Sequence, residues 1–128
     1  MKRLIKEIDT TPFYNVLLHT DDTCSISIDE DDVTNLFENA TSLSFLVTNG
    51  DSLKDALKRL DPKELDFDKA KKAIFLVRYS QAYPMAASDL SELGRYIDES
   101  VPKADVRWGL ATNKESNENV TLVVATTY

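Results

Sequence analysis

The order of hydrophobic and polar residues predicts helices and strands that alternate along most of the chain. In three segments apolar residues recur every three or four positions, as they do on the buried face of a helix. These segments are 31–40, 53–60 and 90–101. Four other segments are short apolar runs or alternations, which are typical of strands. They are 42–48, 73–77, 104–111 and 120–125.

Local signals indicate how these elements begin and end. Ser52 and Ser88 stand where the N-caps of the second and third helices belong. Asn49-Gly50 predicts a turn directly after the first of the four strands. Gly94 falls on the apolar face of the third helix, where it would let that helix approach a sheet closely.

The first 25 residues predict a separate small element, a β-hairpin. Residues 14–19 and 24–28 are both apolar and short, and the polar segment 20–23 between them is prone to turn. We therefore expect a single domain over 1–128, in which 1–25 extends a body formed by 26–128. The last two strands are joined by a loop too short for a crossover helix, so the sheet is mixed. The predicted fold is a two-layer α/β (α+β) structure with helices flanking that sheet.

From Ile26 onward the elements resemble the C-terminal domain of the FtsZ/tubulin family of cytoskeletal GTPases. Three motifs of this chain stand in the order that the family has. They are Ser27-Ile28-Asp29-Glu30-Asp31-Asp32-Val33 for the loop Asn-x-Asp-x-x-Asp-Val, Val106-Arg107-Trp108-Gly109 for the strand with Trp-Gly, and Val120-Thr121-Leu122-Val123-Val124-Ala125-Thr126 for the closing strand. The resemblance implies a four-stranded mixed sheet in the order 1-4-2-3.

The part of the family that binds GTP has no counterpart in this sequence. FtsZ proteins hold the nucleotide in a separate N-terminal domain with a Gly-rich loop, whereas this chain has only three glycines, Gly50, Gly94 and Gly109. The family's long central helix is replaced by the predicted hairpin. We therefore expect no GTP binding and no cofactor.

The charge of the chain is negative and unevenly distributed. The formal net charge is −7, which argues against nucleic acid or an anionic membrane surface as a partner. Between Glu7 and Leu53 there is no Lys or Arg, and the carboxylates are densest at Asp29-Glu30-Asp31-Asp32. No apolar run approaches the roughly 20 residues of a membrane span. A lone Cys24 and the lack of a signal-peptide core fit a cytoplasmic protein.

The acidic cluster has two interpretations. Carboxylates at a helix N-terminus cap its free N–H groups and favour the positive end of its dipole. The resemblance instead places Asp29 and Asp32 against the nucleotide of a neighbouring subunit, with Glu30 and Asp31 as added charge that would repel a triphosphate. A calcium loop is not expected, because the Gly at its sixth position and the Glu at its twelfth are missing.

Six other side chains carry chemistry that the sequence leaves open. A lone His19 and Cys24 are expected to be structural, and Trp108 is expected in the core or at a sheet edge. Arg78, Arg95 and Arg107 would form an anion pocket if the fold brought them together, and surface salt bridges if it did not; their spacing does not favour the pocket.

Two functions remain for such a chain. The first is a non-enzymatic protein-interaction module that associates with itself, as a homo-oligomer, or docks on an FtsZ-like polymer of the cell-division machinery. The second is a small-molecule-binding or enzymatic domain that uses the same scaffold at a subunit interface. Converging arginines around a large pocket would favour the second, and a flat or acidic contact surface the first.

Overall fold

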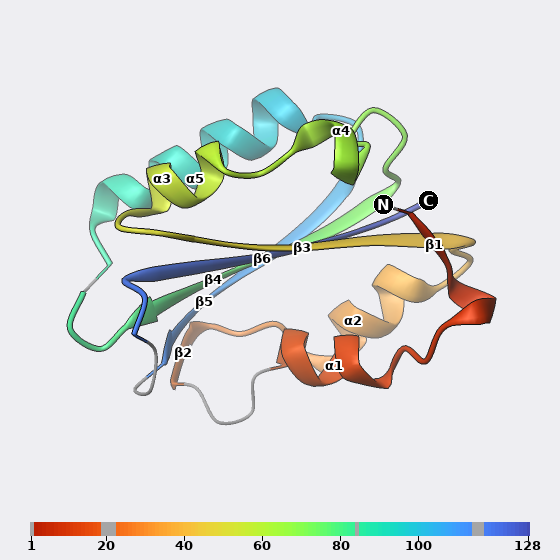
Figure 1. Ribbon diagram of the computed structural model, residues 1–128, viewed down its shortest axis with the longest axis horizontal. Helices are drawn as coiled ribbons and strands as arrows, with labels where there is room; N and C mark the ends of the chain where they lie inside the picture. The colour runs from red at the N-terminus through yellow and green to blue at the C-terminus, as the bar shows by residue number, and fades with distance from the viewer. Residues whose placement is uncertain (1, 19–22, 84, 114–116) are drawn as a thin grey trace.

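A mixed sheet with helices on both faces forms the molecule (Figure 1). The computed structural model describes residues 2–18, 23–83, 85–113 and 117–128. The helices are α1 (Thr11–Leu18), α2 (Glu30–Phe37), α3 (Leu53–Lys58), α4 (Pro62–Leu65) and α5 (Ala87–Ser100), with a 3-10 turn at Ile5–Glu7. The strands are β1 (Arg3–Leu4), β2 (Thr23–Ile26), β3 (Ser42–Gly50), β4 (Lys72–Ser80), β5 (Asp105–Asn113) and β6 (Val120–Thr127).

The strands lie in the order β1-β3-β6-β4-β5-β2. The four long strands therefore follow the expected order 1-4-2-3. β4 and β5 are parallel, because α5 crosses over between them, and every other neighbouring pair is antiparallel. The prediction of an α/β fold with a mixed sheet is confirmed, but β1 and β2 extend the sheet from four strands to six.

The predicted N-terminal hairpin is wrong. Residues 14–18 belong to helix α1, and β2 pairs antiparallel with β5. Phe13 and Leu17, and likewise Tyr14 and Leu18, are four residues apart, so the apolar run also fits one face of a helix. Leu17 is buried in the core under α2, and the other three side chains pack against that core. This contact selects the helix over the strand. The N–H of Thr11 donates to Oδ1 of Asp9 at 3.0 Å and starts the helix.

The expected two-layer arrangement is wrong as well, because both faces of the sheet are covered. In Figure 1, α3, α4 and α5 lie on one face and α1 and α2 on the other. Strand β4 shows the reason. Phe75 and Val77 are buried in a first core, under α3 and α5, whereas Ile74 and Leu76 are buried in a second core, under α1 and α2. A strand that is apolar on both faces must be covered on both.

Two glycines behave differently from the sequence prediction. Gly50 is the last residue of β3, since β3 continues its pairing with β6 as far as Val120. A Cβ on Gly50 would stand 2.6 Å from the backbone nitrogen of Ala56, so this glycine allows α3 to fold back closely. Gly94 is exposed on α5, and a Cβ there would meet nothing within 4 Å. Its expected contact with the sheet is absent.

The segment after α3 is anchored by buried side chains, and one predicted helix cap is not found. Leu65 and Phe67, which follow the charged segment after α3, are both buried. Ser88 lies inside α5, which begins at Ala87, and the carboxylate of Asp89 caps the helix by accepting from the N–H of Ala86 at 3.2 Å. Over the described ranges, no helix is both long and apolar enough to cross a bilayer.

Candidate functional site

The acidic cluster is the N-terminus of α2. Asp29 is the N-cap, and its Oδ1 accepts from the N–H of Asp32 at 2.9 Å. In return the Oδ2 of Asp32 accepts from the N–H of Asp29 at 3.1 Å. This reciprocal capping box satisfies two N–H groups that the helix cannot satisfy itself. The helix-capping interpretation of Asp29 and Asp32 is therefore confirmed.

The charge of the cluster is only partly neutralised. Arg107, on β5, pairs with two carboxylates. Its Nε lies 3.5 Å from Oδ1 of Asp32, and its Nη1 lies 3.0 Å from Oδ1 of Asp105. Asp29, Glu30 and Asp31 are exposed. In the part of the chain that the structure describes, no group of three His, Cys, Asp or Glu side chains is arranged to hold a metal ion. The cluster is thus a capped helix end that presents negative charge to solvent.

The pairing of Arg107 with Asp32 is the feature of this site that sequence reasoning missed. The sequence leaves Arg107 between an anion pocket and a surface salt bridge, and no local pattern names Asp32 as its partner. The link arises because the chain after β2 passes beside β5, where a Cβ on Gly109 would stand 2.9 Å from the carbonyl oxygen of Ile26. Gly109 therefore lets residues 26–28 approach β5 and brings α2 to Arg107.

The three arginines of the proposed anion pocket do not converge. Arg107 pairs in register with Ile74, which is buried in the core under α2, and Arg78 follows Ile74 and Leu76 at every second position of β4, so both arginines lie on that face of the sheet. Arg95 is exposed on α5, which covers the opposite face, and its guanidinium pairs with Glu92 at 3.9 Å. The anion pocket is therefore wrong for this set of residues.

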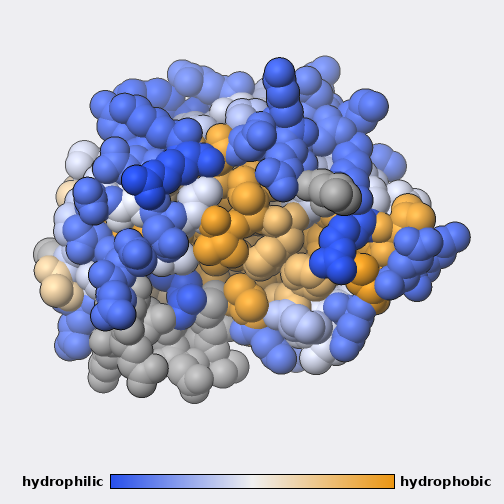
Figure 2. Space-filling model, viewed as in Figure 1, coloured by the Kyte–Doolittle hydropathy of each residue, from blue (hydrophilic) through white to orange (hydrophobic). Residues whose placement is uncertain are grey.

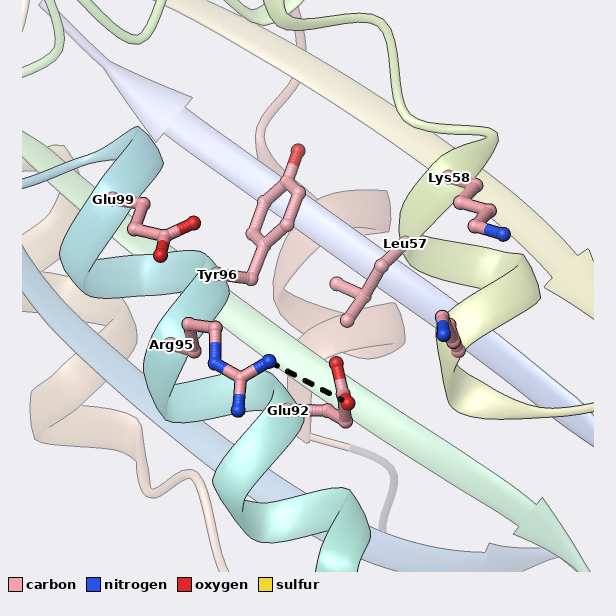
Figure 3. A pocket seen from close by; sticks show the side chains of 7 residues that line it. Leu57, Lys58, Glu92, Arg95, Tyr96 and Glu99 are labelled. Carbon is pink, nitrogen blue, oxygen red and sulfur yellow. Dashed lines mark ion pairs between the residues drawn. The ribbon is translucent and has the colours of Figure 1, made fainter.

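Arg95 instead lines a shallow pocket between α3 and α5 (Figure 3). Its volume is about 200 Å³, and it is lined by Lys54, Leu57, Lys58, Glu92, Arg95, Tyr96 and Glu99. In Figure 3, Leu57 and Tyr96 point toward one another across the gap between the helices, whereas Lys58 points away. Burial raises the pKa of Tyr96. Ligand pockets are commonly about 300–1,000 Å³ in volume, so this one suits at most a very small molecule.

Three further predicted residues have mixed outcomes. His19 lies outside the described residues. The backbone of Cys24 is placed in β2, opposite Ala111, but its side chain lies outside the description. Trp108 lies on β5 with 36% of its surface exposed, which places it near a sheet edge rather than in the core.

Comparison with known proteins identifies the fold. No protein-family model matches the chain, and no curated protein matches its sequence. FtsZ of M. jannaschii, solved as an empty dimer, aligns with a TM-score of 0.72 and 21% identity over 93% of this chain and 36% of that one. TubZ of Bacillus thuringiensis serovar israelensis, in a GTPγS-form protofilament, aligns with a TM-score of 0.65 and 12% identity over 92% of this chain and 33% of that one.

These likenesses establish the fold. The chain has the fold of the C-terminal domain of FtsZ and TubZ, and it spans about a third of the length of the solved chains it matches. At the place of the expected hairpin the structure has the short helix α1 and the strand β2.

Proposed function

We propose that this chain is a non-enzymatic protein-interaction module that docks on a filament of the FtsZ or TubZ type. One observation carries the proposal: nearly the whole chain aligns with one domain of proteins described as a dimer and as a protofilament, and with only a third of their length. In this proposal the domain carries one of the surfaces through which subunits of such proteins contact one another. It joins a filament through that surface.

The acidic end of α2 supplies the contact surface in this proposal. Asp29, Glu30 and Asp31 are exposed, and Arg107 neutralises only Asp32. Capping uses one oxygen of Asp29 and one of Asp32; the second oxygen of Asp32 faces Arg107, whereas that of Asp29 is not used by the cap. The complementary surface on the partner is therefore basic or carries Mg²⁺, since four carboxylates do not approach a bare triphosphate favourably.

The small-molecule alternative has less support in the geometry. This alternative predicts a large pocket surrounded by converging arginines. Arg95 and Arg107 instead lie on opposite faces of the sheet, and the pocket beside Arg95 measures about 200 Å³. The site that presents the most concentrated charge is a surface and not a cavity.

Filament docking can be tested by adding this protein to FtsZ of M. jannaschii at a tenth of its concentration during assembly. We expect co-sedimentation with the polymer and shorter filaments in electron micrographs. Glu30→Gln with Asp31→Asn removes two charges without touching the capping box, and it should weaken both effects several-fold.

A matched control distinguishes this surface from the overall charge. Asp98→Asn with Glu99→Gln removes two charges from α5, on the other face of the sheet, and should behave like the parent protein. Unchanged filament length and no co-sedimentation of the parent protein would refute the docking role and leave the cluster as a helix cap.

A further inference from the structure

The sheet has a free edge along most of β3. β1 pairs only with Ser42 and Leu43, and none of the described strands pairs with residues 44–50 on that side. The N–H of Tyr128 donates to the carbonyl of Ser42, so even-numbered residues of β3 bond to β6 and odd-numbered ones face the free edge. Consistently, the carbonyl of Asn49 accepts from Arg59 at 2.7 Å across that edge.

The guanidinium of Arg59 covers this edge at Asn49, but β3 itself lacks the features that usually prevent sheets from joining. β3 contains neither a charged residue nor a proline, whereas natural edges are commonly protected by lysine, proline or a bulge. Val47 is 46% exposed in its middle, and Leu46 and Phe45 are half-buried beside it. Figure 2 shows hydrophobic side chains gathered over this part of the molecule and surrounded by hydrophilic ones. An apolar strand with open hydrogen-bonding groups fits another strand.

The opposite edge of the sheet is formed by β2. It is short, it is the last strand of the order, and its Ile26 is 37% exposed. The sheet thus ends on both sides in a strand with an exposed β-branched residue.

The charges that flank the two edges are opposite in sign. Beside β3, the first six residues carry three cations and no carboxylate, and α3 with the following Arg59 carries three cations and one carboxylate. Beside β2, the chain runs directly into Asp29-Glu30-Asp31-Asp32. A surface with net charge −7 resists self-association in general, but pairing these two edges brings unlike charges together.

The strand directions also suit the pairing of unlike edges. β3 is antiparallel to β6, β6 to β4, and β5 to β2, while β4 and β5 are parallel. It follows that β2 runs antiparallel to β3 within one molecule. Two molecules in the same orientation, side by side, therefore place β2 of one antiparallel to β3 of the other, with their helical layers in register.

We propose that copies of this chain associate head to tail, the β2 edge of one copy pairing with the β3 edge of the next to form a sheet that continues across subunits. The exposed Ile26 and Val47 lie at this junction, and the acidic end of α2 faces the basic β1 segment of the neighbour. Because the two surfaces differ, the association does not close on itself as a two-fold dimer does. The inference shares the acidic end of α2 with filament docking, but the β2 and β3 edges belong to it alone and it does not depend on that docking.

Sedimentation velocity of the purified protein alone tests the association. We expect species larger than a dimer whose size grows with concentration up to about 1 mM, the range expected for a weak contact. Raising the salt from about 50 mM to about 500 mM should weaken the association several-fold, because the flanking charges are exposed. A chain that stays monomeric over this range would overturn the proposal.

Complementary variants distinguish unlike edges from like ones. Val47→Lys places a charge on the β3 edge, and Ile26→Lys places one on the β2 edge. Each variant alone should be monomeric, and a mixture of the two should give one-to-one heterodimers, because one intact edge of each kind remains. A symmetric β3–β3 dimer would instead leave the Ile26→Lys variant dimeric by itself, and that result would also overturn the proposal.

Two controls separate assembly from folding. Val47→Thr keeps a β-branched, uncharged residue and should assemble like the parent protein. If the loss of its circular dichroism signal shows that Val47→Lys does not fold, charge-reversal variants test the same association instead. Arg3→Glu with Lys6→Glu should reduce association at low salt at least several-fold, and mixing with a Glu30→Lys, Asp31→Lys variant should restore it. Failure of both the reduction and the restoration would contradict the assigned contact.

Discussion

The capping of helix α2 explains the presence of Asp29 and Asp32, two residues that also match the family's loop. Each carboxylate accepts from the backbone N–H of the other, at 2.9 and 3.1 Å, which explains both acids and their spacing of three. Glu30 and Asp31 take no part in this capping box. Asp29 and Asp32 therefore stabilise the helix, whereas substitutions of Glu30 and Asp31 test the binding of a partner without disturbing the cap.

Removing the cap should be measurable without any partner. Asp29→Ala should lower the free energy of unfolding by about 1 kcal/mol, because the N–H of Asp32 loses its acceptor. Asp29→Asn should cost only a few tenths, since its side-chain oxygen accepts in the same way. Urea denaturation measures both. Equal losses in the two variants would mean that charge, and not the hydrogen bond, stabilises the helix end.

Two tyrosines should make stability fall at high pH. Burial, followed by the nearby Asp89 carboxylate, raises the pKa of Tyr79, and burial raises that of Tyr96. The folded state therefore holds these protons more tightly than the unfolded chain, whose tyrosines titrate near pH 10. Their contribution is complete below about pH 10 and declines as the pH rises above it.

The free energy of unfolding, measured from pH 8 to about pH 11, checks this sign. The parent protein should lose stability over the upper part of that range. Tyr79→Phe and Tyr96→Phe should each show a shallower decline, because the substituted residue cannot ionise. A decline of the same slope in all three proteins would assign the pH dependence to other groups.

At the scale of elements, α2 covers the sheet through two residues rather than three. Val33 and Leu36 are buried, but Phe37 is half-buried and stacks on Tyr14 of α1 with ring centroids 5.4 Å apart. Leu36→Ala should cost about 2–5 kcal/mol as a core truncation. Phe37→Ala should cost less, about 1–3 kcal/mol, because part of the ring already contacts water. Chemical denaturation of the two variants should reproduce this order, and the reverse order would place Phe37 in the core.

Helix α5 contains a residue that weakens it. Gly94 lies in its interior and is exposed, with open space where a Cβ would stand. Gly94→Ala should therefore stabilise the protein by about 0.5–1 kcal/mol, since alanine loses less backbone freedom on folding. Gly50→Ala is the contrast and should destabilise it, because its Cβ would stand 2.6 Å from the backbone of α3. A thermal melt of each variant shows the sign, and a lower melting temperature for Gly94→Ala would mean that α5 packs differently.

The whole molecule has the fold of the C-terminal domain of FtsZ and TubZ, and we expect it not to bind GTP by itself. Its glycines lie singly in β3, α5 and β5, so they form no phosphate-binding loop. We predict that isothermal titration of the protein with GTP and Mg²⁺ gives no heat of binding. Micromolar affinity would contradict this expectation and revive the small-molecule alternative.

The four long strands, the α/β class and a helix cap at Asp29 or Glu30 could be predicted from the sequence, because each rests on local information. Apolar periodicity distinguishes helix from strand where a segment is long enough, and N-capping depends on residues three apart. The strand order 1-4-2-3, which the structure has, is implied only by the family resemblance that the order of the motifs carries.

Tertiary structure alone decided the features that depend on which distant segments meet. Residues 13–18 satisfy both a strand and a helix pattern, and contact with the second core selects the helix. Gly94 lies on the apolar stripe of α5 in sequence, but the helix is rotated so that this position faces solvent. The ion pair of Arg107 with Asp32 and the separation of Arg95 from Arg107 follow from sheet register, which no local pattern encodes. The free edge of β3 is of the same kind, because whether a strand is an edge depends on the neighbours that the whole chain provides.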